Sequence, residues 1–153
     1  MSKGEGRSAA RLAAVQALYQ MDVTGKGIVE ILAEFESHWI GREIEGAQYK
    51  PAELAFFRDI LQGVLDHQIA IDRRIDATLS EGWPLKRVEA VMRAILRAGD
   101  YELGKRLDVP ARVIITEYVD IAAAFFDREE AGMTNAVLDA LARKTRAQEF
   151  AGR

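Results

Sequence analysis

The sequence contains no cysteine, three prolines and two histidines. Without cysteine the chain forms no disulfide and offers no thiolate ligand, which is typical of proteins in a reducing compartment such as the cytoplasm. His38 and His67 fall in different segments and lack the spacing of a zinc-binding helix motif, so we expect no metal and no cofactor. The scarcity of proline, together with many alanines and leucines, favours helices.

Long apolar runs and a strong excess of one charge are also missing. No apolar run approaches the roughly 18–20 residues that span a bilayer, and the first residues lack the apolar segment of a secretory signal, so we expect no membrane association. The net charge is −3, which argues against a uniformly basic nucleic-acid-binding protein. Residues 85–112 nevertheless carry seven basic and four acidic residues, for +3. Such a region can attract a polyanion, but it also fits an ordinary solvated helix face.

Apolar residues do recur at spacings of three and four, the period of a helix. Helices are predicted over approximate residues 8–21, 29–39, 53–79, 85–103, 110–125 and 134–141. The run over 53–79 predicts one unusually long helix, and the run from 85 is either one helix or two with a bend. We therefore predict an all-α single domain over residues 1–153, a bundle of about six to eight helices. Its expected ends are a flexible basic tail at 1–7 and a frayed C-terminal segment at 145–153.

The residue types of a catalytic site occur without the arrangement that catalysis needs. Asp72 and Asp76 share a helical face, as paired carboxylates do, but Arg73 and Arg74 beside them indicate a solvated charged face. No Ser-His-Asp set is recognisable, and the GKG at 25–27 lacks the flanking residues of a phosphate loop. We therefore expect a protein that is not an enzyme.

The stretch ARLAAVQALYQMDVTG, residues 10–25, carries polar side chains on an otherwise apolar helical pattern. Helical spacing predicts that Leu12, Val15 and Leu18 face the core. Gln16 and Tyr19 then lie on another edge, where an amide can hydrogen-bond to an unpaired RNA base and a ring can stack on one. A tyrosine at the core edge whose hydroxyl reaches water is the alternative, and the residues alone leave both open.

Three basic residues, Lys3, Arg7 and Arg11, lead into this edge and are candidates for phosphate contacts. They are a small electrostatic footprint, because each phosphate neutralised on a single strand adds only about −0.7 to the salt slope. We therefore expect weak RNA binding unless a partner protein extends the site.

Four segments, in this order, resemble the NusB family of bacterial transcription antitermination factors. They are ARLAAVQALYQMD at the start, FFRDILQGV at 56–64, RAILRAGDYEL at 93–103, and DVPARVIITEYVDIAAAFF from residue 108, continuing to TNAVLD at 134–139. The resemblance spans nearly the whole chain. It implies an all-helical RNA-binding protein that pairs with NusE, a small-subunit ribosomal protein, binds the boxA element of nascent RNA, and joins an antitermination complex on RNA polymerase during ribosomal RNA synthesis.

The resemblance also implies which residues face each partner. The RNA-facing candidates are Lys3, Arg7, Arg11, Gln16, Tyr19, Glu129, Met133 and Asn135, the last three from an expected loop. The NusE-facing candidates are Arg93, Arg97, Tyr101, Glu102, Tyr118 and Phe126. The chain departs from the family at Ser8 and Ala9, where arginines are common, and at Met133, where an aromatic residue is common. These departures imply weaker intrinsic RNA binding or more dependence on the partner.

Three other interpretations stay open. One is a helical protein-interaction adaptor without RNA contact, in which Gln16 and Tyr19 are ordinary helix-edge residues. A second, an RNA-binding domain detached from an RNA-modifying enzyme, fits poorly because the chain leaves no room for a cofactor-binding α/β domain. Finally, Phe125, Phe126 and Met133 either form a homodimer surface or belong to the core.

Overall fold

The computed structural model describes residues 3–43, 51–79 and 84–151, with side chains described over 6–37, 53–79 and 84–151. These residues form seven α-helices, two short 3₁₀ helices and no strand, which confirms the all-α prediction. The elements are α1 Lys3–Thr24, α2 Ile28–Glu43, α3 Pro51–Asp66, α4 Gln68–Thr78, η1 Leu85–Arg87, α5 Ala90–Lys105, α6 Ala111–Phe125, α7 Arg128–Thr145 and η2 Ala147–Phe150. Over the described residues, no helix combines the length and apolar character needed to cross a membrane.

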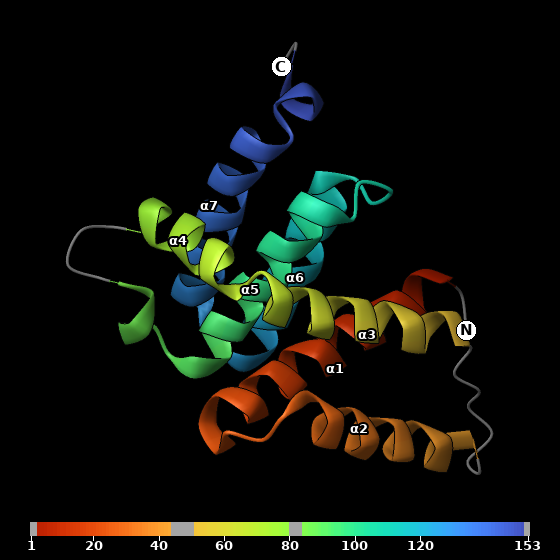
Figure 1. The fold of residues 1–153 in the computed structure, drawn as a ribbon. Coiled ribbons are helices and arrows are strands. Elements are labelled where there is room, and N and C mark those ends of the chain that lie inside the picture. Colours follow the sequence, from red (N-terminus) through yellow and green to blue (C-terminus); the bar gives the residue numbers. More distant parts are fainter. Residues whose placement is uncertain (1–2, 44–50, 80–83, 152–153) are drawn as a thin grey trace.

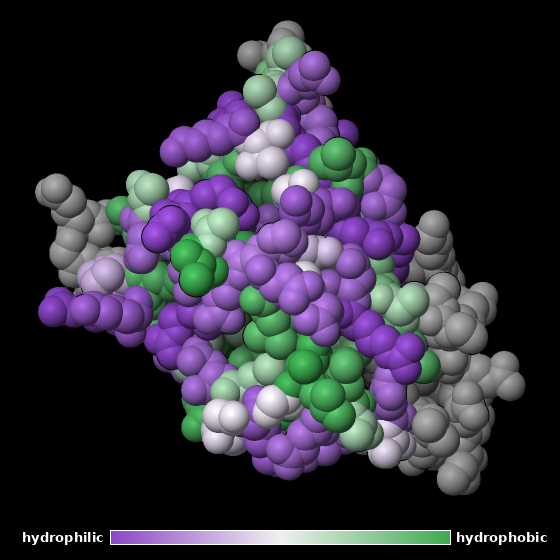
Figure 2. All heavy atoms as spheres, viewed as in Figure 1, coloured by the Kyte–Doolittle hydropathy of each residue, from purple (hydrophilic) through white to green (hydrophobic). Residues whose placement is uncertain are grey.

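Helix α5 forms the centre of the bundle and packs against α1, α3, α4, α6 and α7 (Figure 1). Its residues from Ala94 to Leu103 are buried almost without interruption, as expected for a helix enclosed on all sides. Helices α1 and α3 lie side by side, and α2 covers them from outside, where Phe35 stacks on Phe57 with ring centroids 5.5 Å apart. Figure 2 shows apolar side chains exposed over the region between α2 and α3.

The first helix is longer than predicted. It begins at Lys3, so residues 3–7, predicted as a tail, continue the helix. Ser8 lies inside the helix and does not cap it. At the other end, Gly25 adopts a φ of +75° directly after the last helical residue, a left-handed conformation that glycine adopts readily and that ends the helix. Val15 and Leu18 are buried as predicted, but Leu12 is 38% exposed, so its predicted core position is wrong.

The predicted long helix over 53–79 is two helices, α3 and α4, separated at His67, whose φ is −118° and ψ is 16°. The break has a packing reason. Helix α3 packs on α1 and α5, whereas α4 packs on α5 and α7 through Ile71 and Ile75. One straight helix could not bury apolar residues against both pairs.

The last helix begins at Arg128, six residues before the predicted start at Thr134. Glu129 and Glu130 therefore lie in the first turn of α7 and not in a loop, a position where the helix dipole favours acidic residues. The C-terminal segment also differs from the prediction, because η2 is folded onto α7 and Arg146 is 6% exposed. Four residues of the segment expected to fray, 147–150, form this short helix.

Candidate nucleic-acid interface

One surface depression, the tyrosine hollow, lies along the polar edge of α1. It is lined by Val15, Gln16, Tyr19, Gln20, Phe35, Val91 and Phe125, with a volume of about 510 Å³. Gln16 is exposed and Tyr19 is half-buried, so an amide and a ring edge are both accessible here. The hollow combines apolar walls with amide groups, which suits the stacking of an unpaired base.

A second depression, the methionine hollow, lies where α5 and α7 begin and α6 ends. It is lined by Val88, Glu89, Met92, Phe126, Glu129, Glu130 and Met133, with a volume of about 440 Å³. The Thr134 hydroxyl donates to the Glu130 carbonyl at 2.9 Å and holds the first turn of α7. The Glu130 Oε2 atom is buried without a hydrogen-bond partner within the described residues. The hollow is therefore apolar at its base and acidic at its rim.

The two hollows are lined in part by consecutive residues of the chain. Val91 lines the tyrosine hollow and Met92 the methionine hollow, and Phe125 and Phe126 are divided in the same way. The fold therefore places five predicted site residues on the walls of these two hollows, although they come from both ends of the chain. These residues are Gln16, Tyr19, Phe126, Glu129 and Met133. Phe126, predicted to face the partner protein, lies with the RNA-facing candidates.

The remaining RNA-facing candidates divide into three cases. Asn135 is exposed on α7 but lines neither hollow. Lys3 lies outside the residues whose side chains are described. Arg7 is partly exposed, pairs with Asp108 at 3.3 Å, and lies over the Phe56 ring at 4.6 Å.

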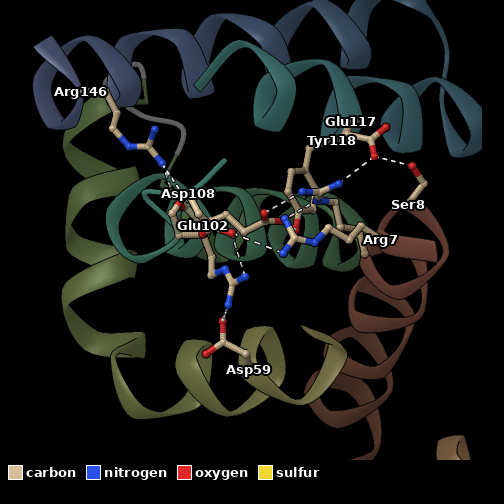
Figure 3. A network of polar contacts seen from close by, with 10 residues as sticks. Arg7, Ser8, Asp59, Glu102, Asp108, Glu117, Tyr118 and Arg146 are labelled. Atoms are coloured by element: carbon tan, nitrogen blue, oxygen red, sulfur yellow. Dashed lines mark hydrogen bonds and ion pairs between the residues drawn. The ribbon is translucent and has the colours of Figure 1, made fainter. Parts of the chain in front are cut away.

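Arg11 requires a correction, because it is 2% exposed and does not lie on the outer edge of α1. Its Nε and Nη2 atoms donate to the two carboxylate oxygens of Glu102 at 2.8 and 3.0 Å, and its Nη1 donates to Glu117 at 2.8 Å. The Tyr118 hydroxyl also donates to Glu102, at 2.5 Å. Figure 3 shows these carboxylates and Tyr118 turned toward one another between helices. Burial, followed by the Glu102 charge, raises the pKa of Tyr118 well above its ordinary value, so the phenol remains a donor.

Three of the predicted partner-facing residues are also buried. Glu102 and Tyr118 are fully enclosed, and Tyr101 is 7% exposed with its hydroxyl donating to Asp59 at 2.7 Å. The reason is the central position of α5, which encloses the polar residues of RAILRAGDYEL together with its apolar ones. These three residues act inside the bundle, which corrects their predicted place on a partner surface.

Arg93 and Arg97 keep some exposure, with 18% and 13% of their side chains accessible. Both bind Asp22 of α1, and Arg97 also pairs with Asp72 of α4 at 2.8 Å. Arg93 donates in addition to the carbonyls of Lys86 and Val88, at 3.2 and 2.6 Å. These arginines join helices to one another, and their exposed edges are small.

Sequence reasoning missed the residues around η1. Lys86 and Arg87 are exposed, and Val88 and Val91 line the hollows. The net charge of +3 over residues 85–112 was the available signal, but it did not distinguish exposed cations from those spent on internal ion pairs.

The model of the NusB family matches residues 8–143. The chain belongs to the NusB family. It is 63% identical over 148 residues to the transcription antitermination protein NusB of a Bradyrhizobium species (strain BTAi1), covering 97% of this chain and 88% of the relative. Among solved structures, that of T. maritima NusB superposes with a TM-score of 0.80 at 28% identity, covering 94% of this chain and 96% of that one.

A second solved structure, of the antitermination factors NusB and NusE in complex with double-stranded RNA, superposes with a TM-score of 0.74 at 26% identity. The match covers 92% of this chain and 98% of that one. The family assigned from four sequence segments is therefore confirmed.

Proposed function

We propose that this chain is a transcription antitermination factor that binds boxA-type single-stranded RNA together with NusE and supports ribosomal RNA transcription. The observation that carries the proposal is the superposition, over 92% of the chain, on one chain of a solved complex of NusB and NusE with double-stranded RNA. The function is binding and not catalysis, and its place beside nascent RNA and RNA polymerase puts the protein in the cytoplasm.

In this proposal the RNA lies across the tyrosine and methionine hollows. Tyr19 supplies a stacking surface, Gln16 hydrogen-bonds a base edge, and Met133 packs against a base in place of an aromatic ring. Lys3, Arg7 and Asn135 contact the strand from the margins. The NusE surface includes Arg97 and Phe126, which keep exposed area after the internal ion pairs form.

The test is a fluorescence titration of a boxA-type RNA and of a scrambled RNA, with and without NusE, at two salt concentrations. We expect weak binding by the chain alone and tighter, salt-sensitive binding to the boxA-type strand when NusE is present. Equal affinity for both RNAs, unchanged by NusE, would contradict the proposal.

One observation supports a second candidate, a helical adaptor that binds NusE without touching RNA. Arg11 is enclosed and Arg7 is paired, so two of the cations predicted for phosphate contacts are already neutralised within the molecule. The adaptor predicts NusE binding that survives Tyr19→Ala, and RNA affinity that does not change when this chain is added to NusE.

A second copy of the chain is a further possible partner, because Phe125 is 46% exposed beside the tyrosine hollow. A homodimer formed there would compete with RNA. Light scattering of the protein with and without RNA measures this competition directly.

A further inference from the structure

The two cationic side chains of η1, Lys86 and Arg87, differ from most other cations near the hollows in their exposure and pairing. Lys86 and Arg87 are exposed, and their side chains make no ion pair or hydrogen bond within the part of the chain that the structure describes. In contrast, Arg93 and Arg97 are paired with carboxylates, and Arg11 is enclosed. The positive charge that η1 presents to solvent is therefore not neutralised within the described part of the molecule.

The backbone of η1 is held firmly although its side chains are not. Arg93 donates to the carbonyls of Lys86 and Val88, and Asp76 of α4 accepts from the Leu85 amide at 2.6 Å. The turn closes with 3₁₀ hydrogen bonds, in which the amides of Arg87 and Val88 donate to the carbonyls of Pro84 and Leu85 at 2.9 and 3.0 Å. In Figure 1, η1 projects from the edge of the bundle ahead of α5. A fixed backbone with outward cations offers two charges in a defined place.

Arg93 also relates η1 to the edge of α1. Its Nε and Nη2 atoms donate to Asp22 at 3.1 and 2.9 Å, while its Nη1 donates to the carbonyls of Lys86 in η1 and of Val88 directly after it. Asp22 lies three residues after Tyr19 on the same helix. One guanidinium therefore joins the helix that lines the tyrosine hollow to the turn that precedes the methionine hollow.

The charge around the methionine hollow makes the position of this turn important. Glu89, Glu129 and Glu130 line the hollow and repel phosphates. A strand whose bases enter the hollow must therefore keep its phosphates away from these carboxylates. Lys86 and Arg87 directly precede Val88 and Glu89, which line the hollow. Phosphates that lie along η1 therefore meet positive charge.

We propose that Lys86 and Arg87 contact the phosphates of RNA bound across the two hollows, and that Arg93 is a positioning residue that holds η1 in place for them. The proposal rests on the proposed function and extends it by assigning phosphate contacts that the first helix alone does not supply.

The test measures the salt dependence of boxA-type RNA binding by the full chain with NusE. A variant that neutralises two fewer phosphates of a single strand has a slope smaller by about 1.4, so raising salt from about 50 to about 200 mM weakens its binding about sevenfold less than that of the wild type. We expect this of Lys86→Ala/Arg87→Ala. The matched control is Lys105→Ala/Arg112→Ala, which removes two exposed cations where α5 ends and α6 begins. We expect it to keep the wild-type slope.

The outcomes separate this proposal from the one it rests on. If the wild type adds no RNA affinity at either salt concentration, the proposed function fails. If the wild type binds but the η1 variant keeps the wild-type slope, or both variants lose slope equally, only the assignment of Lys86 and Arg87 is overturned.

Arg93→Lys tests the positioning role of Arg93. The substitution keeps the charge but loses the planar guanidinium that binds Asp22 and η1 at the same time. We expect weaker RNA binding and faster amide hydrogen exchange at residues 85–88. The same change in the Lys86→Ala/Arg87→Ala background is expected to weaken RNA binding no further. A full additive loss in that background would assign Arg93 a role unrelated to η1.

Discussion

The Arg11 guanidinium in α1 forms a two-point ion pair with the Glu102 carboxylate in α5, and the two residues are 2% and 0% exposed. Tyr118 of α6 donates to the same carboxylate, so three helices meet at one charge. Removing a partner from such a set leaves an uncompensated charge in a site that water does not reach.

Arg11→Met is therefore expected to cost about 3–5 kcal/mol of unfolding free energy, measured by urea denaturation. Adding Glu102→Gln should recover part of the loss, because no charge then remains buried. The control is Arg143→Ala, which breaks the exposed pair with Asp139 and a cation–π contact with Phe150, and is expected to change stability by no more than about 1 kcal/mol. A loss for Arg11→Met as small as that of the control would show that the pair is not enclosed.

Arg146 is a second buried guanidinium, and it binds backbone. It donates to the carbonyls of Leu103, Val109 and Arg106 at 2.7, 2.9 and 2.9 Å, which satisfies acceptors at and beyond the C-terminal end of α5. Arg146→Ala is expected to destabilise the protein by about 3 kcal/mol, since each orphaned buried acceptor costs about 1–3 kcal/mol. Thermal unfolding with Lys144→Ala as the exposed control measures this. Equal melting temperatures for the two variants would contradict it.

Gly63 in α3 is required by close packing. A Cβ at this position would overlap the Tyr101 ring of α5, whereas a Cβ at Gly104 would have no neighbour within 4 Å. Gly63→Ala is therefore expected to cost about 1–3 kcal/mol by overpacking. Gly104→Ala, also in a helix, is expected to be neutral or to stabilise by up to about 1 kcal/mol. Chemical denaturation compares them, and a gain in stability for both would refute the steric argument.

Asp100 is expected to make the free energy of unfolding depend on pH in a definite direction. Burial raises its pKa above the ordinary value in spite of the ion pair with Arg74 at 2.7 Å. The folded state then binds this proton more tightly than the unfolded state, so its contribution to stability is present at low pH and is lost as pH rises through about 4 and above. Asp100→Asn, which does not titrate, is expected to gain stability relative to wild type between about pH 3.5 and 6. Urea titrations of both proteins at both pH values measure how much more stable Asp100→Asn is than the wild type. A difference that stays constant or decreases as the pH rises would contradict the prediction.

Tyr19 tests the tyrosine hollow as a base-stacking surface. Tyr19→Ala is expected to weaken RNA binding in the presence of NusE by about 1–3 kcal/mol, the usual contribution of one stacked base, while Tyr19→Phe keeps most of the affinity. Fluorescence anisotropy measures both, with NusE pairing followed separately. Equal losses for Phe and Ala would assign the effect to the hydroxyl and not to the ring.

Periodicity located the helices whose faces are buried, and it failed where helices are exposed. The segment DREEAGMT breaks the apolar pattern because Arg128, Glu129 and Gly132 face solvent in the first turns of α7, although the backbone there is helical. The spacing of apolar residues indicates which face of a helix is buried. It does not show whether the backbone forms helical hydrogen bonds. For the same reason it could not detect the break at His67, where the apolar stripe continues while the helix axis changes direction.

The site was predicted in part. Gln16 and Tyr19 were assigned to the edge of α1 from helical spacing, and they do line a hollow. Arg11 was assigned to phosphate contacts because it is one of three basic residues that lead into this edge. Its carboxylate partner lies 91 residues away, and no local pattern connects the two. Lys86 and Arg87 were overlooked because the sequence alone does not distinguish cations that form internal ion pairs from cations that remain exposed.

The pairing of Arg11 with Glu102 and Glu117 also bears on how the chain folds during synthesis. Helix α1 leaves the ribosome with an arginine on its inner face, and the carboxylates that neutralise it follow 91 and 106 residues later. Until then, burying that face would strand a charge in an apolar interior, so docking of α1 is unfavourable. Helix α1 therefore docks in its native place only after α5 and α6 have been made.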